Sequence, residues 1–304
     1  MRRGPDRPRL GIAIYGRAAR GHLSGWMILT ARHFEFRFPR PMLVMGIVNV
    51  TPDSFSDGGK FFDPEAAVAH GLAQVAQGAE ILDVGGESTR PGAQPVSEAE
   101  ELRRVIPVIR KLAAQTTVPL SIDTVKPAVA RAALEAGASM VNDVGAFRGD
   151  REMWRVVAEF HAGYVVMHAP GLPGLMPAEP VAGDIIREVG DFFSRRLNEL
   201  PTEAGITAEQ VMLDPGIGFG KSLEQNLQLL GNLGSFKKWR RPLLLGVSRK
   251  SFIEKLTGAK MNGRLPGSLA CATLAAAAGV SVIRVHDVPE TVQAVRVAEA
   301  ILRK

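Results

Sequence analysis

Short, nearly continuous apolar runs alternate with longer amphipathic segments from Pro41 to the C-terminus. Unbroken apolar runs are typical of parallel strands covered on both faces, because a strand with one solvated face would alternate apolar and polar residues. The expected strands are residues 43–50, 80–86, 119–124, 139–144, 163–168, 211–216, 242–248 and 281–287. The pattern therefore predicts eight parallel strands.

Amphipathic segments between these strands predict helices. Asp63 precedes Pro64, which places a capping side chain before a proline at the first helical position. Ser97 and Glu100 have the spacing of a capping box, and apolar residues follow them at helical intervals. Further helices are expected over residues 126–136, 151–160, 184–200, 222–232, 266–278 and 289–302.

Repeated strand–helix units fit either a closed barrel or an open, doubly wound sheet. The open sheet predicts a Gly-rich dinucleotide turn after an early strand, and the chain has none in the required form. Residues 216–222 (GIGFGKS) resemble a phosphate-binding loop, but Pro215 stands where that motif requires glycine. We therefore expect an α/β fold with a single (β/α)8 TIM barrel at residues 35–304, after a short N-terminal extension at residues 1–34.

Positive charge is concentrated before the first predicted strand. The formal net charge of the 304-residue chain is +6 at pH 7, and nine arginines before Pro41 face only Asp6 and Glu35. The rest of the chain is close to neutral, so we expect no nucleic-acid partner. Cys271 is the single cysteine, which excludes an internal disulfide and a cysteine-built metal site, and its small-residue neighbours predict a buried structural thiol.

The arginine-rich start loosely resembles a transit peptide but lacks a compact apolar signal core. Met27 is an alternative start, and we expect residues 1–26 to have no folded role. The chain contains no run of eighteen or more apolar residues, so we expect no membrane span and a cytoplasmic location.

Polar residues lie near the C-terminal end of every predicted strand. In a barrel these positions converge on one face, where the active sites of this fold lie. Asp83 or Asn142 alone fits a helix cap equally well, but capping does not explain the complete set. The set is Asn49, Asp83, Asp123, Asn142, His168, Asp214, Ser248 with Lys250, and Arg284 with His286. We interpret it as a polar pocket.

The chemistry of this pocket indicates two subsites. Carboxylates beside an amide can bind a flat heterocycle through an amino-pyrimidinone edge. Lys250, Arg284 and His286 add positive charge on two adjacent strands, and the loops after the last two barrel strands frequently form phosphate sites. The sequence therefore predicts a heterocycle site beside an anion site.

Long motifs make the resemblance specific. Residues 49–59 (NVTPDSFSDGG) and 83–93 (DVGGESTRPGA) resemble the dihydropteroate synthase family closely. The similarity covers roughly residues 35–304 and continues in the family's order. It includes SIDT (121–124), VNDV (141–144), LDPGIGFGK (213–221), GVSRKSFI (246–253) and RVHDV (284–288). It implies the barrel already inferred and a reaction that joins a hydroxymethyl-dihydropterin diphosphate to 4-aminobenzoate, releasing diphosphate.

The resemblance also implies roles for individual residues. Asn49 is expected to be the protein ligand of Mg²⁺, and Asp123, Asn142 and Asp214 to hydrogen-bond the pterin, with Lys250 reaching the same ring. Arg284 is expected to cover the pterin and contact diphosphate, which His286 and Thr89 also bind. The 4-aminobenzoate pocket is expected to include Phe55, Arg90, Pro91, Phe219 and Ser251, the last at a helix start that attracts anions. Asp57 is expected to contact the arylamine nitrogen, while Asp83 belongs to the heterocycle site.

Several features stay open at the level of sequence. Loops 51–60 and 86–97 are expected to close over bound pterin diphosphate. Residues 167–173 (MHAPGLP) depart from the family pattern, so Met167 is either a pterin contact or a core residue, and His168 is expected to be structural. Residues 142–150 (NDVGAFRGD) also depart from the family pattern, so no role is assigned to Arg148 or Asp150. A homodimer is implied by resemblance alone.

Two other functions compete with this interpretation. A methyltransferase that passes a methyl group from a reduced folate to a corrinoid protein shares the barrel, but should lack the TPDSFSDGG and STRPG loops. A catalytically silent pterin-binding module should first lose the metal-binding and phosphate-binding residues. Both loops are intact, and Asn49, Arg90, Lys250, Arg284 and His286 are present. The synthase is therefore favoured.

Overall fold

The computed structural model describes residues 26–51, 63–88, 94–171 and 183–302. Its main sheet has eight parallel strands in the order β8-β7-β6-β5-β4-β3-β10-β9. A parallel bridge between Leu213 and Leu243 joins the two ends of this order and closes the sheet into a barrel. The strands are β3 (Leu43–Asn49), β4 (Ile81–Gly85), β5 (Leu120–Asp123), β6 (Met140–Asp143), β7 (Gly163–Met167), β8 (Val211–Asp214), β9 (Leu244–Gly246) and β10 (Val282–Val285).

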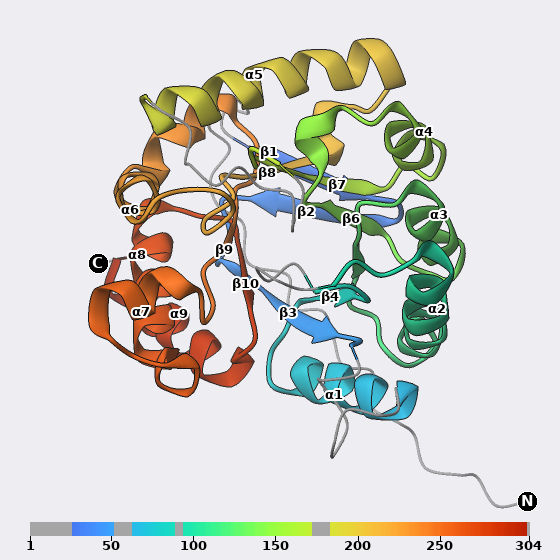
Figure 1. Ribbon diagram of the computed structural model, residues 1–304, viewed down its shortest axis with the longest axis horizontal. Coiled ribbons are helices and arrows are strands. Elements are labelled where there is room, and N and C mark those ends of the chain that lie inside the picture. Colours follow the sequence, from blue (N-terminus) through green and yellow to red (C-terminus); the bar gives the residue numbers. More distant parts are fainter. Residues whose placement is uncertain (1–25, 52–62, 89–93, 172–182, 303–304) are drawn as a thin grey trace, which may run out of the picture.

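Helices surround the strands as an outer ring (Figure 1). They are α1 (Pro64–Ala76), α2 (Glu98–Gln115), α3 (Pro127–Glu135), α4 (Arg151–Glu159), α5 (Ile185–Ala204), α6 (Leu223–Gly231), α7 (Ser251–Thr257), α8 (Leu265–Ala278) and α9 (Val288–Leu302). Each expected strand overlaps an observed one, and the expected (β/α)8 TIM barrel is confirmed.

Capping explains where the first helices begin. The Asp63 side chain accepts a hydrogen bond from the Glu65 amide, with Pro64 at the first helical position, as the sequence predicts. Ser97 accepts from the Glu100 amide at the start of α2. In a capping box the Glu100 side chain would also accept a hydrogen bond from the Ser97 amide. Here the Glu100 carboxylate binds the Arg103 and Arg104 guanidinium groups instead.

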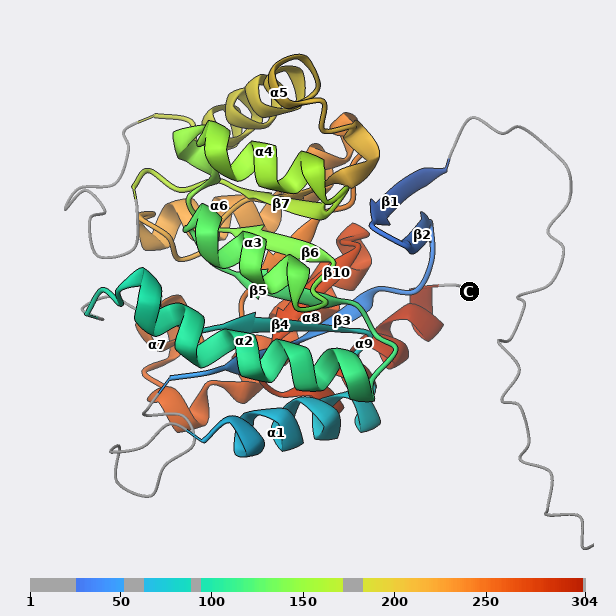
Figure 2. The same cartoon turned by 90° about the vertical axis from the view of Figure 1, so that its right-hand side faces the viewer.

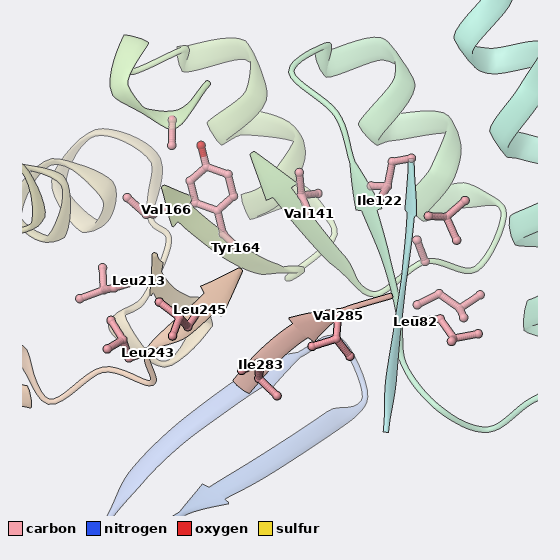
Figure 3. Packing of buried hydrophobic residues seen from close by; sticks show 14 of the residues in the cluster. Leu82, Ile122, Val141, Tyr164, Val166, Leu213, Leu243, Leu245, Ile283 and Val285 are labelled. Carbon is pink, nitrogen blue, oxygen red and sulfur yellow. The ribbon is translucent and has the colours of Figure 1, made fainter. Parts of the chain in front are cut away.

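Residues alternate between the two faces of the barrel wall, because successive side chains of a strand point to opposite faces. One set packs outward against the helices and forms the large apolar core; it includes Leu82, Ile122, Val141, Tyr164, Leu213 and Ile283 (Figure 3). The other set, which includes Met45, Ile81, Met140, Val165, Met212 and Val282, forms a second apolar cluster within the barrel.

A β-hairpin completes the inner cluster. Strands β1 (Met27–Ala31) and β2 (Phe34–Phe38) pair antiparallel, and Leu29, Phe36 and Phe38 are buried against the inner set of barrel residues. The hairpin lies at one end of the barrel (Figure 2). It therefore covers the apolar N-terminal mouth, opposite the polar ends of the strands.

This hairpin corrects the expected domain boundary. The sequence interpretation assigned residues 1–34 to an extension outside the barrel unit, yet β1 lies wholly within that range. Arg32 in the hairpin turn donates to the carbonyls of Leu134 and Ala138 at 2.7 Å and 2.9 Å, which ties the turn to the C-terminal end of α3. The barrel unit therefore includes the hairpin, while the expectation for residues 1–25 falls outside the described residues.

Two smaller expectations concern membranes and the thiol. No described helix is long and apolar enough to cross a membrane. Cys271 is only partly buried; it packs against the outer core from α8, and burial raises the pKa of its thiol. One face of α8 therefore belongs to the core, whereas Leu274 on the same helix is 67% exposed.

We predict that Phe38→Ala lowers the free energy of unfolding by about 3–5 kcal/mol, because it leaves a cavity in the apolar cluster within the barrel, here called the apolar plug. Phe38 is 2% exposed. Phe34→Ala, at a partly buried position of the same hairpin, is the matched control and should cost clearly less. Urea unfolding of both variants measures the difference. Equal losses would contradict a stabilising role of the buried face of the hairpin.

Candidate active site

Arg284 is the centre of a buried charged cluster within the barrel. From β10 its Nε donates to Asp83 Oδ2 at 2.6 Å and its Nη2 donates to Asp123 Oδ2 at 2.7 Å. Asn142 Nδ2 donates to the same Asp83 oxygen at 3.0 Å. The structure therefore brings together four predicted site residues from β4, β5, β6 and β10, as convergence of the strand ends requires.

Burial controls the protonation of this cluster. It raises the pKa of Asp123 to about 7, although the Arg284 cation opposes the shift. Burial disfavours the Arg284 cation too, but the negative charges of Asp83 and Asp123 outweigh that effect and raise the pKa of Arg284. The carboxylates therefore favour the charged guanidinium, while burial disfavours the charged form of the Asp123 carboxyl.

Lys250 contributes a second cation to the pocket. It is the N-cap residue of α7, and its Nζ donates to the carbonyl of Ile217 in the loop after β8. The same Nζ lies 4.6 Å from the centre of the Phe219 ring. Burial lowers the pKa of Lys250 to about 8, with Asp214 opposing the shift.

Asp214 lies at the end of β8 and is 6% exposed. Its Oδ1 accepts a hydrogen bond from the Gly216 amide at 2.7 Å, which starts the loop that carries Phe219. Burial raises the pKa of Asp214, and the charge of Lys250 opposes that shift. This carboxylate is therefore held close to a cation in the same pocket.

His286 and Arg249 tie together the loops after β9 and β10. His286 Nδ1 lies 3.0 Å from Ser248 Oγ, which also accepts from the His286 amide at 3.2 Å. Arg249 adopts a left-handed backbone conformation (φ 57°) and forms a two-pronged ion pair with Asp287, with Nε donating at 2.9 Å. These contacts tie the residues just before Lys250 to His286 and to the residue that follows it.

The remaining predicted residues divide into described and undescribed sets. Asn49 ends β3, Ser251 is the first residue of α7, and Met167 is buried beside Phe219, Val144 and Ala169. The structure thus places Met167 in a small apolar cluster at the polar end of the barrel. Outside the described residues lie Phe55, Asp57, Thr89, Arg90 and Pro91.

His168 does not belong to the charged cluster. Its Nε2 lies 3.2 Å from Glu188 of α5, and its ring packs edge-on against Phe192. Burial lowers the pKa of His168 to about 3, so the imidazole is neutral. The expected structural role follows from these contacts.

The sequence interpretation missed two functional candidates. Lys221 donates to three loop carbonyls between β7 and α6, and a lysine inside a glycine-rich segment after a strand was the available signal. The pairing of Arg249 with Asp287 joins positions 38 residues apart. Such a pair leaves no periodic pattern, so no sequence signal could have found it.

Comparison with known proteins identifies the family. A family described as "Pterin binding enzyme" matches residues 45–286. The dihydropteroate synthase of Escherichia coli strain K12 is 47% identical over 259 residues, which cover 85% of this chain and 91% of that protein. The dihydropteroate synthase of Synechocystis is 45% identical over 269 residues, covering 88% and 93% respectively.

Solved structures show the same similarity. The Yersinia pestis dihydropteroate synthase, solved with a sulfonamide drug, has a TM-score of 0.85 and 42% identity, and covers 91% of this chain and 100% of that chain. The Xanthomonas albilineans enzyme, solved with 4-aminobenzoic acid, has a TM-score of 0.84 and 47% identity, covering 92% and 99%. The barrel, its charged mouth and these matches together show that the chain belongs to the dihydropteroate synthase family of pterin-binding enzymes.

Proposed function

We propose that this chain condenses 6-hydroxymethyl-7,8-dihydropterin diphosphate with 4-aminobenzoate to give 7,8-dihydropteroate and diphosphate. The cluster in which Arg284 pairs with Asp83 and Asp123 carries the proposal, because it combines a carboxylate-lined pocket with cations at its rim. The Xanthomonas albilineans relative has been solved in complex with 7,8-dihydropteroate, and it is 46% identical with a TM-score of 0.81. With this reaction the chain is a transferase of folate biosynthesis.

The pterin subsite is the buried half of the pocket. Asp123, Asn142 and Asp214 present hydrogen-bonding groups at the ends of β5, β6 and β8, and each is at most 9% exposed. A flat ring with amino and carbonyl groups offers complementary donors and acceptors. In this proposal Lys250 reaches the same ring and Arg284 covers its face, while Asp83 holds Arg284 and Asn142 in position.

The diphosphate subsite lies at the rim. His286 and Arg284 belong to the end of β10, where a barrel commonly binds phosphate, and Thr89 completes the proposed set. Among the described residues, no group of three or more His, Cys, Asp or Glu side chains is placed to hold a metal ion. The donor set fits Mg²⁺ bound through the Asn49 amide oxygen, substrate phosphates and water. Mg²⁺ would neutralise charge on the leaving diphosphate.

The second substrate supplies the nucleophile, so no side-chain nucleophile is required. The carbon–oxygen bond to diphosphate breaks first, leaving a cationic pterin methylene that ring nitrogens delocalise. The arylamine nitrogen then forms the new bond and loses a proton, with Asp57 as the proposed contact. Phe55, Arg90, Pro91, Phe219 and Ser251 form the proposed 4-aminobenzoate pocket. Arg284 and His286 stabilise negative charge as the diphosphate departs.

Assembly and location belong to the same proposal. Each of the helices α7, α8 and α9 carries an exposed apolar side chain: Leu256, Leu274 and Ile301 are 50%, 67% and 67% exposed. These helices lie together at one side of the ring (Figure 1). Apolar exposure of this kind supports a homodimer formed through them. We further propose that the enzyme works in the cytoplasm.

A direct assay tests the proposed reaction. We predict that the purified chain, with pterin diphosphate and Mg²⁺, releases diphosphate only when 4-aminobenzoate is present, and that 7,8-dihydropteroate accumulates in equal amount. Methyl transfer from a methylated reduced folate to a corrinoid protein is the control reaction. Methyl transfer without diphosphate release would favour the methyltransferase, and neither reaction would favour a silent binding module.

We predict that Lys250→Ala reduces kcat/KM by about 100- to 1000-fold, because it removes a preorganised cation from the pocket. The melting temperature should change little, since the hydrogen bond of Lys250 to Ile217 is a loop contact. Lys255→Ala, at an exposed position of the same helix, is the matched control for kinetics and melting. Unfolding of Lys250→Ala would instead make Lys250 structural.

We predict that Asn49→Ala raises the Mg²⁺ concentration needed for half-maximal activity at least about tenfold, because it removes the proposed protein ligand. Titration of Mg²⁺ at saturating substrates measures this concentration. Lys250→Ala is the contrasting variant, since its residual activity should show an unchanged Mg²⁺ requirement. An Asn49→Ala enzyme with the Mg²⁺ requirement of the unchanged protein would remove Asn49 from the metal site.

A further inference from the structure

Lys221 is a partly buried cation that neither the pterin nor the diphosphate subsite uses. Its Nζ donates to the carbonyls of His168 at 3.1 Å, Gly216 at 2.8 Å and Phe219 at 3.2 Å. An ammonium group has three N–H donors, and all three are engaged. Burial lowers the pKa of Lys221 to about 7, while Asp214 opposes that shift. The side chain therefore holds three backbone acceptors of two different loops.

The loops after β7 and β8 touch at this point. A Cβ atom on Gly216 would lie 1.9 Å from the His168 carbonyl oxygen, and Gly216 has a φ of 67°, so only glycine fits. On the other side, Asn226 of α6 accepts from the Gly218 amide at 2.6 Å and is itself 3% exposed. The turn formed by residues 216–221 is thus held by two side chains: Lys221 binds the carbonyls of Gly216 and Phe219, and Asn226 binds the amide of Gly218.

The consequence of this arrangement falls on Phe219. Its carbonyl accepts from Lys221, and its amide donates to the Gly216 carbonyl at 3.2 Å, to which Lys221 also donates. The Phe219 ring packs beside the Met167 cluster and lies under the Lys250 ammonium. Lys221 therefore fixes the backbone from which the ring projects towards Lys250.

We propose that Lys221 is a positioning residue that sets specificity and affinity for the arylamine substrate through Phe219. The inference rests on the proposed function, in which Phe219 lines the 4-aminobenzoate pocket. Lys221 acts on the loop more than on the pterin subsite, because Asp123 and Asn142 lie on β5 and β6 and Asp214 ends β8 before the loop begins. Loss of the ammonium leaves three carbonyls without this donor and lets the Phe219 ring leave its place.

Steady-state kinetics separates positioning from general stability. Lys221→Met keeps the approximate length of the side chain but removes its donors. It should raise KM for 4-aminobenzoate about tenfold, which corresponds to a loss of about 1.4 kcal/mol of binding free energy. KM for pterin diphosphate and kcat should each change less than about threefold. Lys221→Arg, which keeps N–H donors, should restore part of the loss. Lys238→Met, an exposed lysine before β9 at the opposite end of the barrel, is the matched control.

A double-mutant cycle with Phe219→Ala tests whether Lys221 changes KM for 4-aminobenzoate through Phe219. If Lys221 acts through Phe219, adding Lys221→Met to Phe219→Ala should raise KM for 4-aminobenzoate less than about twofold further. Multiplicative effects, or equal rises in both KM values, would overturn the inference. Should Lys221→Met not fold, Lys221→Gln replaces it in the same cycle. Absence of 7,8-dihydropteroate with the unchanged protein would instead overturn the proposed function itself.

Discussion

The pairing of Arg284 with Asp83 and Asp123 is the interaction on which the site depends. A guanidinium inside a barrel is costly unless carboxylates neutralise it and hydrogen bonds occupy its donors. Its two partners lie 201 and 161 residues away in the chain, on β4 and β5. They reach it only because β3 pairs with both β4 and β10. The charged cluster therefore depends on the strand order of the closed barrel.

On three strands, a core residue and a site residue lie two positions apart on the same face. Met140, Met212 and Val282 belong to the inner apolar cluster, and two residues later the same face carries Asn142, Asp214 and Arg284. Because alternate residues share a face, each of these three strands contributes both to the inner apolar cluster and to the pocket. The β1–β2 hairpin covers the apolar end, so the opposite end can carry poorly compensated polar groups such as Asp83, whose Oδ1 has no partner among the described residues.

Much of this architecture could be predicted from the sequence. Buried parallel strands are apolar runs, so β3 to β10 were located within a few residues, and the polar residues that end them marked the pocket. The hairpin was missed because its strands are short and lie in an arginine-rich region, although Phe34–Phe38 (FEFRF) alternates apolar and polar residues as a strand with one exposed face does. Contacts made by Lys221, and the pair Arg249–Asp287, depend on loop geometry that the fold creates. The glycine-rich segment around Lys221 marks a loop but not its contacts, and the pair of Arg249 and Asp287 leaves no local pattern at all.

Strand and loop residues therefore have different tasks at the same mouth. The strand residues Asp123 and Asn142 are fixed by the barrel, so their positions vary little unless the fold itself changes. Loop residues depend on local ties instead: Ser248 orients His286, and Lys221 holds the backbone at Phe219. Because these ties lie outside the apolar plug, selection can alter loop geometry, and with it the choice of the second substrate, at small cost to folding. The buried pterin half offers no comparable freedom, since the charge of Arg284 must remain paired in every variant.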